Sequence, residues 1–217
     1  MFNPIVETLE KLSETTPATL TVIIALALFA AVMFFAGKKV RWDARSLAQA
    51  AMCIALSYIL SCFRLFRFEF GGSITLFSML PVILCALAQG PARGIVIGCA
   101  YGLLQLIQDF YISHPMQLLL DYPLAFAMLG LAGLAKYLPL PQRAKLPAAV
   151  LIAACGRFAM HLISGAVFFG SYAAPGQSAL AYSFIYNIGY MGPDAALCLL
   201  AACVPVTHRI GRMLARK

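Results

Sequence analysis

Long runs of apolar residues alternate with short polar or basic segments along almost the whole chain. The runs cover residues 19–36, 46–62, 73–88, 94–107, 115–135, 147–169 and 180–204. A transmembrane helix needs about 20 predominantly apolar residues, because it rises 1.5 Å per residue across a hydrocarbon layer about 30 Å thick. Most runs approach or reach that length. The pattern therefore predicts an all-α integral membrane protein with seven transmembrane helices.

The composition narrows the class further. Of the 217 residues, 62% are hydrophobic and 11% are charged, and a soluble domain of this length could not bury so much apolar surface. The net charge of +8 is typical of basic cytoplasmic loops and gives no reason to expect nucleic acid as a partner. The 7 cysteines all lie in apolar runs without CxxC spacing. We therefore expect buried free thiols and no bound metal.

Basic residues predict the orientation of the chain in the membrane. Lys38, Lys39, Arg41 and Arg45 follow the first run, and further basic residues lie in segment 136–145 and in the C-terminal HRIGRMLARK. Cytoplasmic loops are enriched in Lys and Arg, so we expect the N-terminus outside and the C-terminus in the cytoplasm. Residues 1–40 are predicted to hold an amphipathic segment and an extra transmembrane helix, and residues 41–217 a six-helix membrane domain.

An acidic residue, Asp121, lies inside the fifth apolar run, in the stretch QLLLDYPLAF at residues 117–126. An acid at the centre of a membrane helix costs roughly 2.5–3.5 kcal/mol on insertion scales. Such residues therefore have a partner or a function, and a bound cation is one way to offset the cost. We interpret Asp121 as the anchor of a small-molecule site.

Two polar residues of other runs are predicted to lie at the depth of Asp121. Counted at 1.5 Å per residue from the outer helix ends, Asp121 lies roughly 9 Å deep, His161 roughly 12 Å and Asn187 roughly 10 Å. Histidine and asparagine in membranes also serve simply to hold helices together. An acid, an imidazole and an amide at one level nevertheless favour a box for a flat cationic heterocycle. The aromatic residues predicted around this layer are Tyr122, Tyr182, Tyr186, Phe168 and Phe169.

Two charged residues are predicted to pair beneath this layer. Arg157 lies roughly 15 Å above the inner surface, and Asp194 lies roughly 9–15 Å above the same surface. Buried charges at that level need partners. We therefore expect a structural ion pair between them.

Two further patterns each allow two interpretations. Ala51 and Ala55 belong to small residues spaced four apart in run 46–62, which allow close approach of a helix either within the chain or from a partner subunit. We interpret these alanines as a docking face that does not line the ligand cavity. Phe66, Phe68 and Phe70 alternate in the following loop, which indicates either an aromatic flap or a belt at the membrane interface.

The motifs around the candidate site resemble a known family. YISHPMQ directly before LLLDYPLAF, then GRFAMHLISGAVFFGSYA, then YSFIYN are similar, in this order, to the thiamine-specific S-component of energy-coupling factor (ECF) transporters, the ThiT or YuaJ family. The resemblance covers about residues 46–205. It implies a six-helix substrate-binding subunit of a bacterial cell membrane, without enzymatic activity or cofactor. Such a subunit takes up thiamine together with a transmembrane T-component and two cytoplasmic ATPases.

The resemblance also implies roles for individual residues. Asp121 would bind the aminopyrimidine ring of thiamine, and His161 would lie near the thiazolium. The family pattern has Glu where this chain has Asp121, and Trp where it has Phe169 and near Ala174. The run 19–36 has no counterpart in the six-helix fold and would be an extra helix. Further ligand contacts would be Tyr111, Tyr122, Tyr182, Asn187 and Phe169.

Two other classes of function stay open on the residues alone. A stand-alone proton-coupled secondary transporter of a small cationic vitamin could carry protons on Asp109, Asp121 and Asp194. An intramembrane enzyme could use Asp121 and His161, although no second acid or metal set is predicted at their depth. The chain has no G-x-x-x-x-G-K-[ST] phosphate loop, so ATP hydrolysis by that route would need partner subunits.

Overall fold

The computed structural model describes residues 27, 40–68, 71–108 and 113–215. These residues are mainly helical and include one antiparallel hairpin of β1 (Arg64–Arg67) and β2 (Ser73–Thr75). The predicted helix at 19–36 and the predicted segment 1–40 lie almost entirely outside the described residues. The helices are α3 (Ala44–Cys62), α4 (Leu80–Gln89), α5 (Pro91–Gln108), α6 (Pro115–Leu119), η2 (Leu120–Leu124), α7 (Ala125–Ala127), η3 (Met128–Tyr137), α8 (Gln142–Phe168), η4 (Gly170–Tyr172), α9 (Ala179–Cys203) and α10 (Pro205–Ala215).

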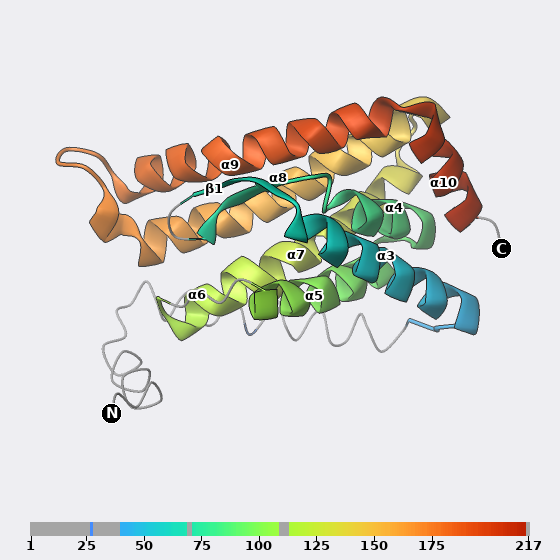
Figure 1. Cartoon of the computed structure of the whole chain (residues 1–217), viewed down its shortest axis with the longest axis horizontal. Coiled ribbons are helices and arrows are strands. Elements are labelled where there is room, and N and C mark those ends of the chain that lie inside the picture. Colours follow the sequence, from blue (N-terminus) through green and yellow to red (C-terminus); the bar gives the residue numbers. More distant parts are fainter. Residues whose placement is uncertain (1–26, 28–39, 69–70, 109–112, 216–217) are drawn as a thin grey trace.

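The two longest helices, α8 and α9, run antiparallel and side by side along one side of the molecule (Figure 1). On the other side lie α3, α5 and the continuous helical segment from α6 through η3. The short α4 lies inside, in contact with α3, α5, η3, α8 and α10. The hairpin packs between α3 and α9, and α10 turns across one end of the bundle.

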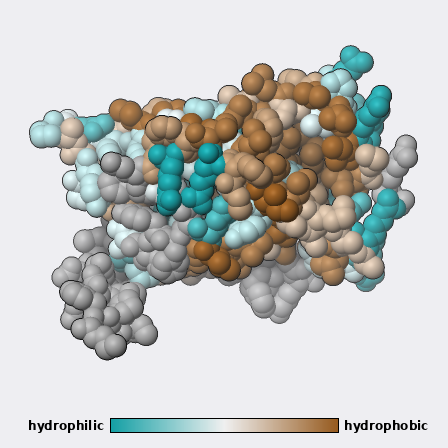
Figure 2. Space-filling model, viewed as in Figure 1, coloured by the Kyte–Doolittle hydropathy of each residue, from teal (hydrophilic) through white to brown (hydrophobic). Residues whose placement is uncertain are grey.

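The described helices fit a membrane environment. Ala44–Cys62, Pro115–Tyr137 and Gln142–Phe168 are each long and apolar enough to cross a bilayer, and α9 with α10 also passes as a pair bent by 81°. Large apolar side chains of α3, such as Leu47, Met52 and Ile59, are more than half exposed. Figure 2 shows hydrophobic residues across much of one face, with hydrophilic residues at both ends and in a patch left of centre. An apolar surface of this size is unfavourable in water and favourable in contact with lipid chains.

The prediction of a transmembrane helix at 73–88 is wrong. Residues 73–75 pair with β1, Phe77 adopts a positive φ of 57°, and the helix begins only at Leu80 with Pro81 in its first turn. The resulting α4 has 10 residues, of which Leu80 to Ala86 are all buried. A helix that is apolar all round and too short to span the bilayer is a core helix, and α4 lies in the hydrophobic core.

A stripe of glycines on α5 brings this helix unusually close to the segment that carries Asp121. A Cβ atom at Gly102 would lie 2.5 Å from the carbonyl oxygen of Tyr122, and one at Gly98 would collide with the carbonyl oxygen of Phe126. Glycine is needed at both positions because only a hydrogen atom fits between the two backbones. The contact fixes η2 and α7 against α5.

Candidate ligand-binding site

A polar cavity lies between the α6–η2–α7 segment, α8, α9 and the β2 end of the hairpin. Its empty space, including its mouth, is about 780 Å³. Carboxylate, imidazole, guanidinium and amide groups face the same space as several aromatic rings, a combination typical of small-molecule sites. The cavity is lined by Gly71, Gly72, Ser73, Gln105, Gln117, Asp121, Tyr122, Phe126, Arg157, His161, Gly165, Phe169, Tyr182, Ser183, Tyr186, Asn187 and Tyr190.

A π-helical turn places Asp121 in this cavity. The fifth predicted helix begins at Pro115 as expected, with the His114 ring accepting a hydrogen bond from the Met116 backbone N–H at 3.1 Å. Residues Leu120–Leu124 then widen into a π-helix around Pro123, which has no N–H to donate. The Ala125 N–H bonds to the carbonyl of Leu120, five residues back. Single π turns inside α-helices are frequent at functional sites.

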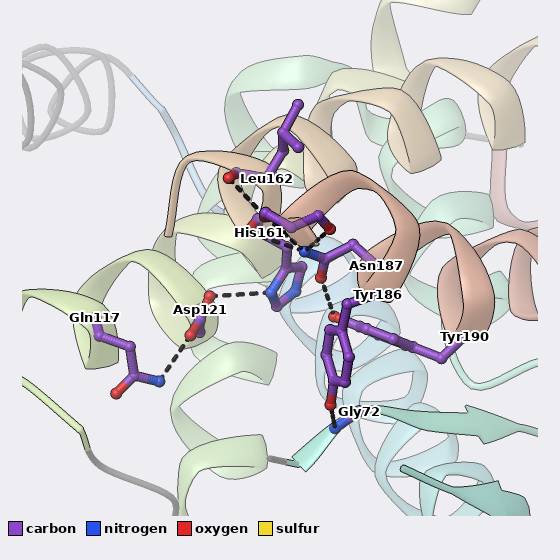
Figure 3. Close-up of polar contacts among 9 residues, drawn as sticks. Gly72, Gln117, Asp121, His161, Leu162, Tyr186, Asn187 and Tyr190 are labelled. Carbon is purple, nitrogen blue, oxygen red and sulfur yellow. Dashed lines mark hydrogen bonds and ion pairs between the residues drawn. The ribbon is translucent and has the colours of Figure 1, made fainter. Parts of the chain in front are cut away.

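Both oxygens of the Asp121 carboxylate have hydrogen-bond donors (Figure 3). Oδ1 lies 3.0 Å from Nδ1 of His161, and Oδ2 accepts from Nε2 of Gln117 at 2.7 Å. An ionised carboxylate only accepts, so when Asp121 is ionised the proton of this first bond is on Nδ1 of the histidine. The side chain of Asp121 retains 16% exposure. It is therefore held in place while an edge still faces the cavity.

Asn187 joins α8 to α9 beside this pair. Its Nδ2 donates to the carbonyl of His161 at 3.3 Å and to that of Ser183 at 2.8 Å, and its Oδ1 accepts from the Tyr190 hydroxyl at 2.9 Å. Ser183 in turn donates to the carbonyl of Leu162 at 2.8 Å. These bonds anchor the helix turn that carries His161 (Figure 3). The Asn187 side-chain amide therefore donates to backbone carbonyls of α8 and α9.

A ladder of tyrosines on α9 forms the aromatic wall of the cavity. Tyr182 and Tyr186 are stacked with centroids 6.2 Å apart, and Tyr186 meets Tyr190 at 5.7 Å. Phe68 of the hairpin segment packs edge-on against Tyr186 at 6.2 Å, and the Tyr186 hydroxyl accepts from the Gly72 N–H at 3.3 Å. Phe68 thus lies beside the aromatic wall, Phe66 is exposed, and Phe70 is outside the described residues, so both interpretations of the phenylalanine loop stay open.

The predicted ion pair between Arg157 and Asp194 is confirmed, with 3.7 Å between Nη1 and Oδ2. Asp194 is 2% exposed and also accepts from the backbone N–H and hydroxyl of Thr75 at 3.1 and 2.8 Å. The Arg157 guanidinium lies 4.3 Å from the centroid of Phe126. Arg157 also lines the cavity, which the sequence did not predict. Because Asp194 offsets the arginine charge, Asp121 is the acidic residue of the described lining, and its contacts are His161 and Gln117.

Two nitrogens beside the cavity have no hydrogen-bond partner among the described residues. They are Nε2 of His161 and Nε of Arg157, and both are buried. Buried polar atoms in folded proteins are almost always paired. When the His161 ring is neutral with its proton on Nδ1, its Nε2 is an acceptor. These atoms are therefore candidates for polar contacts with a ligand.

Six of the seven predicted ligand-binding residues surround this one cavity, and Tyr111 lies outside the described residues. Asp121, His161 and Asn187, which were predicted at a common depth, are linked through the bonds above. Whether they bind a ligand remains a prediction. Ala51 and Ala55 are exposed on α3 and do not line the cavity. The six residues are Asp121, Tyr122, His161, Phe169, Tyr182 and Asn187.

Several residues that line the cavity were not predicted from the sequence. Gln117 lies one helical turn before Asp121, and a polar residue four positions away on the same face was a usable signal. Tyr190 continues the four-residue spacing of Tyr182 and Tyr186 and could have been found in the same way. Gln105 and the hairpin residues at 71–73 gave no such signal, because their place depends on contacts distant in sequence.

Fold and cavity together define the class as a multi-pass helical membrane protein with a polar cavity whose lining suits a small molecule. A sequence model of the thiamine transporter protein family (Thia_YuaJ) matches residues 47–213. The chain therefore belongs to this thiamine transporter family, which confirms the resemblance of its motifs. Membership of a family of transporters implies a role other than catalysis.

Individual relatives agree with this assignment. The thiamine transporter ThiT of Bacillus subtilis (strain 168) is 38% identical over 144 residues, which cover 62% of this chain and 74% of that protein. ThiT of Lacticaseibacillus paracasei is 29% identical over 153 residues, or 64% of this chain and 74% of that protein. A solved structure of ThiT from Listeria monocytogenes has a TM-score of 0.60 at 23% identity, covering 78% of this chain and 96% of that one. This last match supports the fold.

Proposed function

We propose that this chain is the substrate-binding membrane subunit that captures thiamine from outside the cell for ATP-driven import by an ECF transporter. The observation that carries the proposal is Asp121, a carboxylate inside a membrane helix that is fixed by Gln117 and His161 at the edge of the polar cavity. The names of the relatives, thiamine transporters of two bacteria, support thiamine as the ligand.

The chemistry of thiamine suits this lining. Its thiazolium carries a fixed positive charge, and its aminopyrimidine presents a donor amine beside an acceptor nitrogen. Each oxygen of Asp121 has one donor in the structure and therefore keeps a lone pair that could accept from the amine. The rings of His161, Tyr122 and the α9 tyrosines would supply faces for the cation, each contributing about 1–2 kcal/mol when desolvated.

The proposal extends to partner subunits and orientation. In ATP-driven import the chain would work with a transmembrane T-component and two cytoplasmic ATPases, because it lacks a phosphate loop of its own. Ala51 and Ala55, exposed on α3, would allow a T-component helix to approach closely. The ligand cavity would open outside, with the N-terminus outside and the C-terminus in the cytoplasm. The N-terminal segment 1–40 would be an appendage to the six-helix domain.

Two measurements test the proposal. Calorimetry of the purified chain with thiamine should show saturable one-to-one binding, and absence of binding would refute the assignment of the cavity. Proteoliposomes should then accumulate labelled thiamine only when the T-component, the ATPases and ATP are all present. Accumulation by the chain alone, driven by a proton gradient without ATP, would instead identify the stand-alone secondary transporter.

A further inference from the structure

A second cavity lies at the other end of the bundle from the polar site. It forms where α10 turns across the ends of α4 and η3 and the start of α8, and its empty space, including its mouth, is about 890 Å³. Lys145 of this cavity and His161 of the polar site lie on the same helix, roughly 24 Å apart at 1.5 Å per residue. The two cavities are therefore separate.

The second cavity has a basic rim. Lys136, Lys145, His208 and Arg212 line it, and none of the described residues that line it is acidic. The sequence has no Asp or Glu between Asp121 and Asp194 and none after Asp194, so η3, α8 and α10 carry no acidic residue. The fourth element that forms the cavity, α4, has none either. Like charges held together without an anion favour the binding of one.

Backbone contacts hold two of these cations in place. Nζ of Lys136 donates to the carbonyl of Ala88 at 3.2 Å, and Nζ of Lys145 donates to the carbonyl of Lys136 at 2.9 Å. The acceptors lie at the C-terminal ends of α4 and η3, where carbonyls lack helical partners. An ammonium group has three donors, so both lysines can still bond an anion from fixed positions.

Behind the basic rim the wall is apolar. Leu84 and Leu146 are 5% and 3% exposed, and Leu87 is partly buried. Val206, Ile210 and Met213 form an exposed apolar face on α10, and α10 is bent by 81° from α9. A short helix with separate apolar and basic faces at the end of a membrane bundle is typical of the membrane interface. Such a position of α10 would place the mouth of the cavity at the level of lipid headgroups.

We propose that this second cavity binds an anionic phospholipid. Lys136, Lys145 and Arg212 hold the headgroup phosphate, and an acyl chain lies against Leu84 and Leu146. Basic pockets between helix ends at the membrane surface suit such headgroups. The apolar wall favours a lipid over a free phosphate ion, which would gain nothing from it. The proposal does not depend on which ligand occupies the polar site.

Native mass spectrometry of the full-length chain in detergent, with added dioleoyl phosphatidylglycerol or phosphatidylcholine, tests the proposal. The key variant is K145Q/R212Q. The matched control, R143Q/R209Q, removes the same charge from exposed positions on the same two helices that do not line the cavity. Each cation near the surface contributes about fivefold to acidic-lipid binding. We therefore expect phosphatidylglycerol to be preferred, with about 25-fold weaker binding in the key variant and little change in the control.

A second variant guards against a folding defect. H208Q/R212Q keeps both lysine–carbonyl bonds and should also lose the lipid, while its thermal unfolding matches that of the control. Equal loss in the key and control variants would show diffuse surface attraction and overturn the proposal. So would equal retention of both lipids, or full displacement of phosphatidylglycerol by millimolar inorganic phosphate. If the cavity binds no lipid but its charges are needed for a partner subunit to co-purify, it is a protein-docking surface. That outcome would also overturn the proposal.

Discussion

Replacing Asp121 by alanine should weaken thiamine binding by about 3 kcal/mol or more, which is about 150-fold in the dissociation constant. Among the described residues no Lys or Arg pairs with this carboxylate, whereas Asp194 is paired with Arg157. Without it, a ligand amine is buried without its acceptor, which costs about 1–3 kcal/mol. Loss of the counter-charge for the thiazolium adds a comparable amount in a partly buried site.

Two conservative variants separate charge from shape. In Asp121→Asn one amide oxygen can accept from either Gln117 or His161, but the NH₂ group then faces the other donor. We expect this variant to bind nearly as poorly as alanine. Asp121→Glu keeps the charge and restores the residue of the family pattern, so its affinity should stay within about tenfold of the wild type.

Isothermal calorimetry on purified protein gives the three affinities, and thermal unfolding without ligand checks that each variant is folded. Asp43→Asn is a matched control, because it makes the same chemical change at an exposed residue before α3, outside the cavity. It should leave the affinity unchanged. If Asp121→Asn binds thiamine as tightly as the wild type, charge is not what the residue supplies, and the proposed mode of recognition is wrong.

Three further perturbations test other parts of the structure. Gly102→Ala should push η2 away from α5, destabilise the fold by about 1–3 kcal/mol and weaken ligand binding. The control Gly189→Ala should have neither effect, because no atom lies nearer than 3.7 Å to its new Cβ. Equal melting temperatures of the two variants would contradict the close contact at Gly102. Asp194→Asn should leave the Arg157 charge facing the cavity, lower the melting temperature and weaken binding of the cation about tenfold or more; unchanged calorimetric and unfolding data would refute that role. Ala51→Trp should abolish uptake in proteoliposomes and leave calorimetric affinity intact, and a folded variant that no longer binds would argue against a docking face.

Regular helices made part of the site predictable from the sequence. The depths of His161 and Asn187 follow from a constant rise per residue, and both lie on uninterrupted helices, α8 and α9. The ion pair of Arg157 with Asp194 followed from the same arithmetic and is confirmed. The constant rise of an α-helix was sufficient to predict these positions, because both helices continue without a break.

The arithmetic failed where contacts distant in sequence decide the local structure. Apolar content alone gave a helix at 73–88, but Thr75 is held in a strand beside Asp194, more than a hundred residues away. The π turn around Pro123 and the approach of Gly102 likewise depend on packing against α5. Hydropathy carries no information about such pairings, so the hairpin side of the cavity could not be predicted.

The contact of α5 with η2 and α7 makes the two sides of the cavity unequal in their capacity to change. Gly98 and Gly102 of α5 meet the carbonyls of Phe126 and Tyr122 directly, so the backbone next to Asp121 has little room to shift. The tyrosines of α9 can instead change rotamer or identity without moving a backbone. Natural variation or engineering toward a different heterocycle should therefore accumulate on α9, while any change in the length of the acid would shift the ligand itself.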